Sequence, residues 1–262
     1  MNHRDCLDLN WQEPSHTPIL QDDGVHLWRA HLDLSDVEIK CLTATLSTRE
    51  IARANRFKFP QHRRRFIAAR GILRQLLGDY LQLNPSQIEF GYGDRGKPFL
   101  LSSLKNSSLK FNVSHSQEYA LLGFSLNHPI GVDIEYLRQM PDALKIAQRF
   151  FSQREFSLLR DAPPERQNQL FFLLWTAKEA YLKAIGIGLS GMLDNVEITF
   201  ETTRVPYCLN IERDRVALAN WSLYSCIPVT DYIAAIAVET YFTALQIDFC
   251  HWNSTRLKSI FN

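Results

Sequence analysis

The chain has 262 residues, enough for one large domain or two small ones, and its 45% hydrophobic and 22% charged residues are those of an ordinary globular protein. A net charge of +1 argues against a wholly basic nucleic-acid binder, and no apolar run approaches the ~20 residues of a membrane span. Five scattered cysteines without a CxxC pair favour reduced thiols, and the polar N-terminus lacks the apolar run of a signal peptide. We therefore expect a cytoplasmic protein that binds no membrane.

The first half of the sequence predicts helices that are followed by short strands. The expected elements are a strand at 25–28, helices at 48–57 and 61–81, and strands at 88–90, 109–113 and 119–125. Ser47 and Glu50 have the spacing of a capping box at the start of the first helix. Glycines and a proline in 92–98 predict a turn between the strands.

The second half repeats this order of helices and strands. The expected elements are a strand at 130–136, helices at 141–151, 152–160 and 166–185, and strands at 196–200, 217–224 and 232–238. The order predicts an α+β protein with one subdomain at 1–127 and a second at 128–262. No residue-level repeat is evident between the two halves, so any duplication is indicated by element order alone.

A basic segment without any acidic residue runs from Ile51 to Gly78. Its cations are Arg53, Arg56, Lys58, Arg63, Arg64, Arg65, Arg70 and Arg74. Such a segment is either a solvated helical face or a site for an anion: phosphate, nucleic acid or an acidic partner. Composition alone does not choose between them.

Two carboxylates lie two residues apart in the expected strand Gly131-Val132-Asp133-Ile134-Glu135. Residues at this spacing share one face of a strand, so Asp133 and Glu135 point to the same side while Val132 and Ile134 point into a core. Two carboxylates on one face repel each other unless a positive group lies between them. The pair is either a solvent-facing pair or part of a metal site.

A second carboxylate motif lies in the expected helix, in the segment Trp175-Thr176-Ala177-Lys178-Glu179-Ala180-Tyr181-Leu182-Lys183. Glu179 and Lys183 are four residues apart and share one helix face. They are either a surface ion pair or functional groups. Because this helix is apolar nearly all round, it is expected to be largely buried, and its charged positions then need a local purpose.

A third group of residues has the chemistry of a phosphate site. Lys97 lies in a turn between Gly96 and Pro98, and the later segment Asn112-Val113-Ser114-His115-Ser116 offers hydroxyl and imidazole donors. Ammonium, hydroxyl and imidazole groups all bind phosphate oxygens. Each piece is weak by itself, and a single histidine is more often structural.

Taken together, GKP, NVSHS, GVDIE and WxxKExxxK, in this order, resemble the Sfp-type 4′-phosphopantetheinyl transferase family, from about Arg53 to Leu189. The resemblance implies a pseudo-dimeric fold of two similar α+β halves with the active site in the cleft between them. It also implies an enzyme that transfers 4′-phosphopantetheine from coenzyme A to a serine of an apo carrier protein. The expected partners are coenzyme A and acidic carrier proteins of fatty-acid, polyketide or peptide synthesis, and the expected state is a monomer.

The resemblance also implies a role for individual residues. Asp133, Glu135 and Glu179 would be ligands of Mg²⁺, the implied cofactor, and Glu179 and Lys183 would be catalytic. The residues implied to contact coenzyme A are Arg53, Gly96, Lys97, Pro98, Ser114, His115, Asp133 and Lys183. Phosphoryl-type transfer depends mainly on positioning and electrostatics, which agrees with a site of carboxylates, a metal and lysines.

Two alternatives remain at the level of the sequence. A metal-dependent phosphodiesterase would use the same three carboxylates and the basic segment, but it would not require the GKP and SHS motifs. A non-enzymatic nucleic-acid-binding protein would use the basic residues of 53–74 and predicts steeply salt-dependent binding. The near-neutral total charge is against this second alternative, and we expect no nucleic-acid partner.

Overall fold

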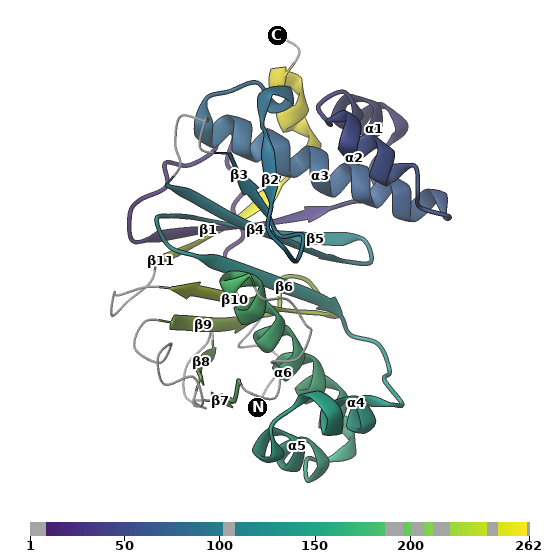
Figure 1. Cartoon of the computed structure of the whole chain (residues 1–262), viewed down its shortest axis with the longest axis vertical. Coiled ribbons are helices and arrows are strands. Elements are labelled where there is room, and N and C mark those ends of the chain that lie inside the picture. Colours follow the sequence, from purple (N-terminus) through teal and green to yellow (C-terminus); the bar gives the residue numbers. More distant parts are fainter. Residues whose placement is uncertain are drawn as a thin grey trace.

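A computed structural model describes residues 9–101, 108–186, 196–200, 207–211, 221–239 and 246–260. Two sheets, each with its own long helix, lie one above the other in Figure 1. The helices are α1 (Asp36–Thr43), α2 (Thr48–Ala54), α3 (Pro60–Leu81), α4 (Ala143–Phe150), α5 (Gln153–Arg160) and α6 (Pro164–Ile185), with short 3₁₀ helices η1 (Pro85–Gln87) and η2 (Ser254–Ile260). The strands are β1 (Gly24–His31), β2 (Phe90–Tyr92), β3 (Pro98–Leu100), β4 (Leu109–Ser116), β5 (Tyr119–Leu126), β6 (Ile130–Tyr136), β7 (Ile198–Phe200), β8 (Tyr207–Ile211), β9 (Trp221–Cys226), β10 (Tyr232–Glu239) and β11 (Gln246–Trp252). The predicted α+β class is confirmed.

The first sheet has the strand order β11-β1-β5-β4 and packs against α3. Its core joins Trp28 of β1 and Phe124 of β5 to Ile72, Leu76 and other apolar residues of the helix. Strand β11 runs parallel to β1, although it comes from the end of the chain. The predicted division between 127 and 128 falls between β5 and β6, but β11 lies beyond it in sequence and belongs to the first sheet.

The second sheet has the order β6-β10-β9-β8-β7, and α6 lies across β6 and β10. Gly131 explains how closely the helix approaches, because a Cβ atom there would lie 2.0 Å from the carbonyl oxygen of Ala180 and 2.4 Å from the nitrogen of Ala184. Only glycine allows this contact between a strand and a helix backbone. The glycine of the GVDIE motif therefore brings the carboxylates of β6 next to α6.

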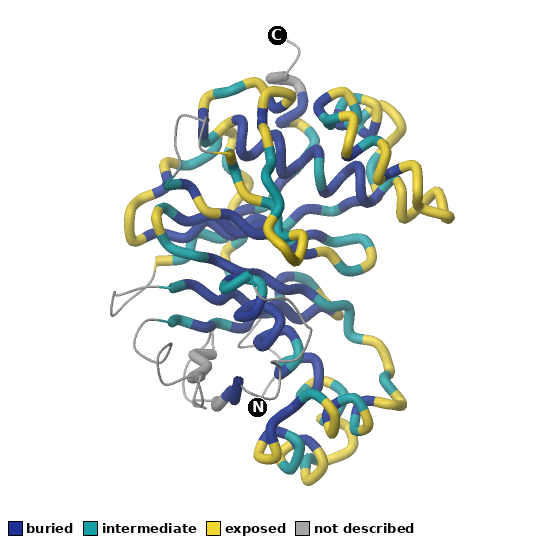
Figure 2. The backbone as a smooth tube through the Cα atoms, viewed as in Figure 1, coloured by how far each residue is buried: buried dark blue, intermediate teal, exposed yellow. Residues whose placement is uncertain are grey.

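A third apolar cluster joins the two halves. It contains Val25, Leu27 and Leu121 from the first sheet and Val132 and Ile236, among others, from the second. Figure 2 shows that the backbone is buried along both long helices and where the two sheets face each other. In the described part of the chain, no helix is long and apolar enough to cross a membrane.

The two halves share their element order and a local helix-capping device. A strand followed by three helices appears as β1-α1-α2-α3 and again as β6-α4-α5-α6, and α3 and α6 both have 22 residues and begin with a proline. The predicted capping box of Ser47 and Glu50 is confirmed at α2, and Ser152 and Glu155 form the same box at α5. Helix α1 and strands β3, β8 and β11 were not predicted. Part of the strand predicted at 217–224 lies outside the described residues, and β9 begins at Trp221.

The repeat extends to a buried ion pair in each half. Arg74 and Lys178 are each the fifteenth residue of their helix, counted from Pro60 and Pro164. Arg74 contacts the capping-box carboxylate of Glu50 at 2.7 Å, and Lys178 contacts that of Glu155 at 2.7 Å, with all four side chains at most 2% exposed. Each cation also donates to backbone carbonyls that follow its helix. The structure therefore contains a residue-level repeat that the sequence did not reveal.

Candidate active site

The predicted site lies where the edges of the two sheets meet, at β4 and β6. No strand pairing joins these two strands in the described structure, but side chains of β4 bond to β6. The buried Asn112 side-chain oxygen accepts a hydrogen bond of 2.9 Å from the backbone nitrogen of Val132. This bond fixes the position of β6 along β4, and with it the position of the two carboxylates that follow Val132.

Asp133 is buried, and its two carboxylate oxygens have different surroundings. Oδ1 accepts hydrogen bonds from Ser114 Oγ at 2.8 Å and from Lys183 Nζ at 2.6 Å. Oδ2 is buried and has no hydrogen-bond partner. A buried carboxylate oxygen without a partner is costly, so this atom is available for a cation or a donor from a ligand. The structure brings Ser114, Asp133 and Lys183 together, as the motifs predicted.

Glu135 and Glu179 complete a group of three carboxylates. Burial first, and then the charge of Asp133, raises the pKa of Glu135, whose Oε2 accepts a 2.8 Å hydrogen bond from Ser116. Burial first, then Asp133 and Glu135 raise the pKa of Glu179 to about 7, while Lys183 lowers it. A carboxyl group that titrates near neutral pH is suited to accept and release a proton. The shared field also shows that a positive charge would be favourable among the three groups.

The chemistry of these donors fits a hard cation such as Mg²⁺, which prefers oxygen ligands. However, no set of three His, Cys, Asp or Glu side chains in the described structure converges closely enough to form a ready-made metal cage. Lys183 also holds one oxygen of Asp133. Mg²⁺ commonly keeps several waters and uses one or two carboxylates together with substrate phosphates, so the orphaned Oδ2 of Asp133 fits a site that a substrate completes.

Lys97 contacts the backbone at the start of β6 and in the last turn of α6. Its Nζ donates to the carbonyl oxygens of Ala184 at 2.9 Å, in the last turn of α6, and of Ile130 at 3.3 Å. Burial, and then repulsion from Lys110, lowers the pKa of Lys97 to about 8. Gly96 has φ +79°, which a glycine adopts without strain, and Pro98 begins β3 opposite Tyr92.

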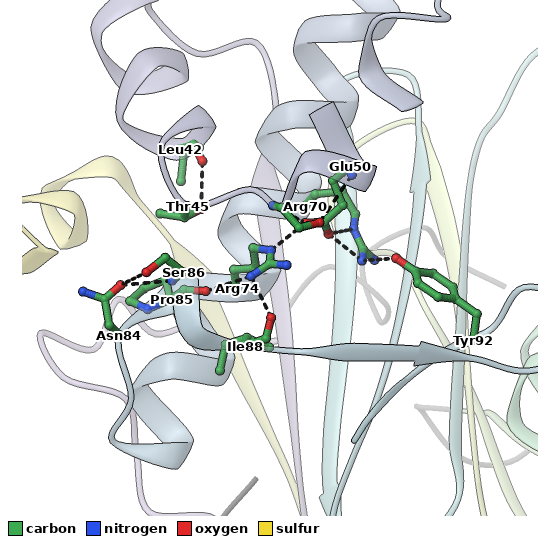
Figure 3. Close-up of polar contacts among 11 residues, drawn as sticks. Leu42, Thr45, Glu50, Arg70, Arg74, Asn84, Pro85, Ser86, Ile88 and Tyr92 are labelled. Carbon is green, nitrogen blue, oxygen red and sulfur yellow. Dashed lines mark hydrogen bonds and ion pairs between the residues drawn. The ribbon is translucent and has the colours of Figure 1, made fainter. Parts of the chain in front are cut away.

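Gly96 also lines a pocket of about 840 Å³ between α2, α3 and the turn before β3. Four arginines line it: Arg49, Arg53, Arg56 and Arg70. Figure 3 shows how one wall is built, with Glu50 between Arg70 and Arg74 and Tyr92 beyond Arg70. Glu50 offsets part of the charge of Arg70 and Arg74, whereas Arg49 and Arg53 of α2 make no ion pair within the described residues.

The electrostatics of His115 connect this pocket with the carboxylates. The pKa of His115 is lowered, first because protein atoms desolvate the ring and then because Lys183, Arg53 and Arg65 lie near it. The residue is exposed to solvent. His115 is therefore in the electrostatic field of both Lys183 of the site and Arg53 of the pocket.

The structure separates the three adjacent arginines that the sequence could not distinguish. Arg64 pairs with Asp36 and also donates to the carbonyl of Leu34, and Arg65 makes two hydrogen bonds to Asp33. Arg63 is exposed, and no ion pair is recorded for it among the described residues. Among the three, Arg63 is therefore the exposed arginine without an ion pair in the described structure.

Some residues of the site had no role assigned from the sequence. Arg49, Arg56 and Tyr92 line the pocket although no motif contains them, and only the acid-free segment drew attention to Arg56. Ser116 is in the NVSHS motif, and its position two residues after Ser114 was the available signal. Lys178, the neighbour of Glu179 in sequence, is fully buried in its ion pair with Glu155.

Comparisons with known proteins show the family of this chain. A family model described as the 4′-phosphopantetheinyl transferase superfamily matches residues 129–237, and one described as 4′-phosphopantetheinyl transferase, N-terminal, matches residues 31–126. The chain is 46% identical to the 4′-phosphopantetheinyl transferase HetI of Nostoc sp. over 247 residues, which are 94% of this chain and 100% of that protein. It is 37% identical to the 4′-phosphopantetheinyl transferase Sfp of Bacillus subtilis over 165 residues, which are 58% of this chain and 71% of that protein.

A solved holo-(acyl-carrier-protein) synthase from Bacillus anthracis, in complex with CoA (3′,5′-ADP), is 21% identical and matches 43% of this chain and 96% of that chain, with a TM-score of 0.34. The structural match is too weak to support an argument. The sequence matches are sufficient: this chain belongs to the 4′-phosphopantetheinyl transferase family.

Proposed function

We propose that this protein transfers 4′-phosphopantetheine from coenzyme A to a serine of an apo carrier protein, giving the holo carrier and adenosine 3′,5′-bisphosphate. The observation that carries the proposal is the state of Asp133. One of its oxygens is held by Ser114 and Lys183, the other is buried without a partner, and Glu179 titrates near pH 7 beside it. Family membership supplies the reaction class.

The proposed cofactor is Mg²⁺, held by Asp133, Glu135 and Glu179 together with phosphate oxygens of coenzyme A. When bound, the ion would neutralise charge on the phosphate under attack and on the leaving group. Without it, burial and then the charge of Asp133 raise the pKa of Glu135, and burial, Asp133 and Glu135 raise the pKa of Glu179. This repulsion among the chain's own carboxylates supports the proposed cation.

In the proposed reaction, the carrier's serine oxygen forms a bond to the phosphorus next to pantetheine. The bond from that phosphorus to the oxygen of the adenosine bisphosphate breaks, and the serine proton passes to Glu179. Lys183, already beside Asp133, stabilises the negative charge of the departing group. Most of the catalysis would come from positioning and fixed charges.

The arginine-lined pocket is the proposed site for the adenosine end of coenzyme A. Arg49, Arg53 and Arg56 offer guanidinium groups to its 3′-phosphate, and the turn through Gly96 leads from the pocket to Lys97. Lys97 and His115 would contact the pyrophosphate, as would Ser114. A guanidinium matches the geometry of a phosphate, and several together bind its double charge.

The carrier protein is proposed to approach the basic corner, defined as Arg56, Lys58 and Arg63 with Phe57 and Phe59. All five side chains are exposed, and none of the three cations has a recorded ion pair within the described residues. Exposed cations beside aromatic rings suit an acidic protein surface. Acyl, peptidyl and polyketide carriers are all candidates. Placement in the cytoplasm and a monomeric state are further parts of the proposal.

The experiment that tests the function is intact mass measurement of an apo acyl carrier protein after incubation with this protein, coenzyme A and Mg²⁺. We expect a gain of one phosphopantetheine per carrier, lost with EDTA and with Glu179→Ala. Transfer that survives EDTA would overturn the metal requirement. No coenzyme A binding by the folded protein would overturn the function, and cleavage of a simple phosphodiester would then favour a metal phosphodiesterase.

A further inference from the structure

The hydroxyl groups of β4 are spaced to match the carboxylates of β6. Ser114 and Ser116 are two residues apart, as are Asp133 and Glu135, and the two pairs are joined by hydrogen bonds of 2.8 Å each. In each pair the serine occupies one carboxylate oxygen, Oδ1 of Asp133 and Oε2 of Glu135. The second oxygen of each carboxylate is left for another partner.

Ser116 is held more firmly than an ordinary surface serine. Its Oγ accepts a 3.1 Å hydrogen bond from the backbone nitrogen of Tyr136 and donates its own hydrogen to Glu135. The backbone of β6 thus fixes the oxygen, and the oxygen can then donate in only one useful direction. Glu135 has more torsional freedom than Asp133, so it depends more on such a fixed donor.

Arg138 offers Glu135 a different position. Its guanidinium lies 3.7 Å from the same Oε2, and its side chain is 48% exposed. If Ser116 did not hold Oε2, this exposed arginine would compete for the carboxylate. Arg138 would then draw the Glu135 carboxylate away from its orientation toward Asp133 and Glu179.

We infer that Ser116 is a positioning residue that orients the Glu135 carboxylate for the cation of the proposed reaction. The inference rests on the proposed function, because it concerns the cation that function requires. It adds a residue to which neither the motifs nor the comparisons assign a role. Loss of a hydrogen-bond partner of a metal ligand typically lowers metal affinity by about 10- to 100-fold.

The test compares Ser116→Ala and Ser116→Thr with the wild type, using Mn²⁺ as the probe and electron paramagnetic resonance to measure binding in the presence of coenzyme A without carrier. We expect Mn²⁺ affinity to fall about tenfold in Ser116→Ala and to be largely restored in Ser116→Thr, which keeps the hydroxyl. In the transfer assay, the Mg²⁺ concentration for half-maximal rate should rise in parallel, with a smaller change in kcat at saturating Mg²⁺.

Ser125→Ala is the matched control. Ser125 is fully buried in β5, and its hydroxyl donates to the carbonyl of His128, far from any carboxylate of the site. This variant should have a lower melting temperature than the wild type and the same Mn²⁺ affinity. An unchanged Mn²⁺ affinity in folded Ser116→Ala, or an equal loss in Ser125→Ala, would overturn the inference. A wild type that transfers without binding Mn²⁺ would instead refute the metal part of the proposed function.

Discussion

Glu179 is a carboxylate buried beside two others, and this burial has opposite effects on stability and catalysis. Its pKa is about 7 in the fold, against an ordinary value of 4.5. Between these values the folded protein holds a proton that the unfolded chain has lost, so this group makes the free energy of unfolding fall as pH rises from 4.5 to about 7. At higher pH the full cost is roughly 3 kcal/mol.

Replacement of Glu179 by Gln should therefore stabilise the protein while it inactivates the enzyme. In EDTA at pH 8, urea denaturation should give the variant a higher free energy of unfolding than the wild type, by up to roughly 3 kcal/mol, with a small difference at pH 5. The transfer rate should fall by roughly 10²- to 10⁴-fold if Glu179 takes the serine proton. A variant that is less stable than the wild type at pH 8 would contradict this account of the site.

The pKa of Lys97 predicts that the affinity for coenzyme A also depends on pH. Its lowered pKa of about 8 means that it loses its proton well before an exposed lysine does. If its ammonium contacts phosphate, the affinity for coenzyme A should fall between pH 7.5 and 9.5, by at most about tenfold per unit. This range lies above the titration of Glu179.

The measurement is isothermal titration calorimetry of coenzyme A in EDTA, with Lys97→Arg as the comparison. Arginine stays charged throughout this range, so the variant should show a flatter pH profile than the wild type. Parallel profiles would mean that Lys97 stays on the carbonyls of Ile130 and Ala184 when the ligand binds. Its role would then be to join the GKP turn to α6.

At the scale of elements, the contact between β6 and α6 decides where the carboxylates lie. Gly131→Ala would force the helix backbone away from the strand, because the new methyl group meets backbone atoms at 2.0 and 2.4 Å. We expect a loss of about 3 kcal/mol or more in the free energy of unfolding, together with a loss of transfer activity.

Gly123→Ala is the control, because its new methyl group would meet side-chain atoms instead of backbone atoms. A Cβ at Gly123 would meet the side-chain atoms Val132 Cγ1 at 2.7 Å and Ile130 Cδ1 at 2.8 Å, and such side chains can shift. Urea denaturation should therefore show a smaller loss for Gly123→Ala, about 1 kcal/mol. Equal losses in the two variants would show that the approach of the α6 backbone is not the special constraint.

The sequence predicted most of the elements that carry the site because each has a strong local signal. Alternation placed Asp133 and Glu135 on one face of β6, and helical spacing placed Glu179 and Lys183 on one face of α6. Strand β11 was missed because its place is decided by a partner more than 200 residues away, β1. The pocket was missed for a similar reason, since α2, α3 and the turn at 92–96 meet only in the fold.

The buried arginines show a further limit of sequence analysis. In the sequence, Arg64, Arg65, Arg70 and Arg74 look like the rest of a basic segment. In the structure all four have carboxylate partners, and those partners lie outside the segment or at its border: Asp33, Asp36, Glu50 and Glu118. A charge run therefore says little about which cations are free until the fold brings their partners to them.

At the scale of the whole molecule, the repeated halves differ at the positions equivalent to the proposed catalytic residues. Counted from the first proline of each long helix, Glu179 corresponds to Gln75, and Lys183 corresponds to Asp79. Gln75 accepts a 3.0 Å hydrogen bond from Trp252 and donates to the carbonyl of Arg256, whose side chain pairs with Asp79 at 2.8 Å. The end of the chain thus covers in the first half the face that carries the site in the second.

Because β11 follows the second half in sequence but belongs to the first sheet, the two halves should unfold together. Trp252 is 2% exposed, and Trp252→Ala should cost about 3–5 kcal/mol in the free energy of unfolding. In both wild type and variant, far-UV circular dichroism and tryptophan fluorescence should give coincident urea transitions, as one cooperative unit requires. Specific activity should change little at a temperature where the variant is folded, since Trp252 contacts α3 and not α6. Two separated transitions in the wild type would mean that the second half holds its carboxylates in place without the closing strand.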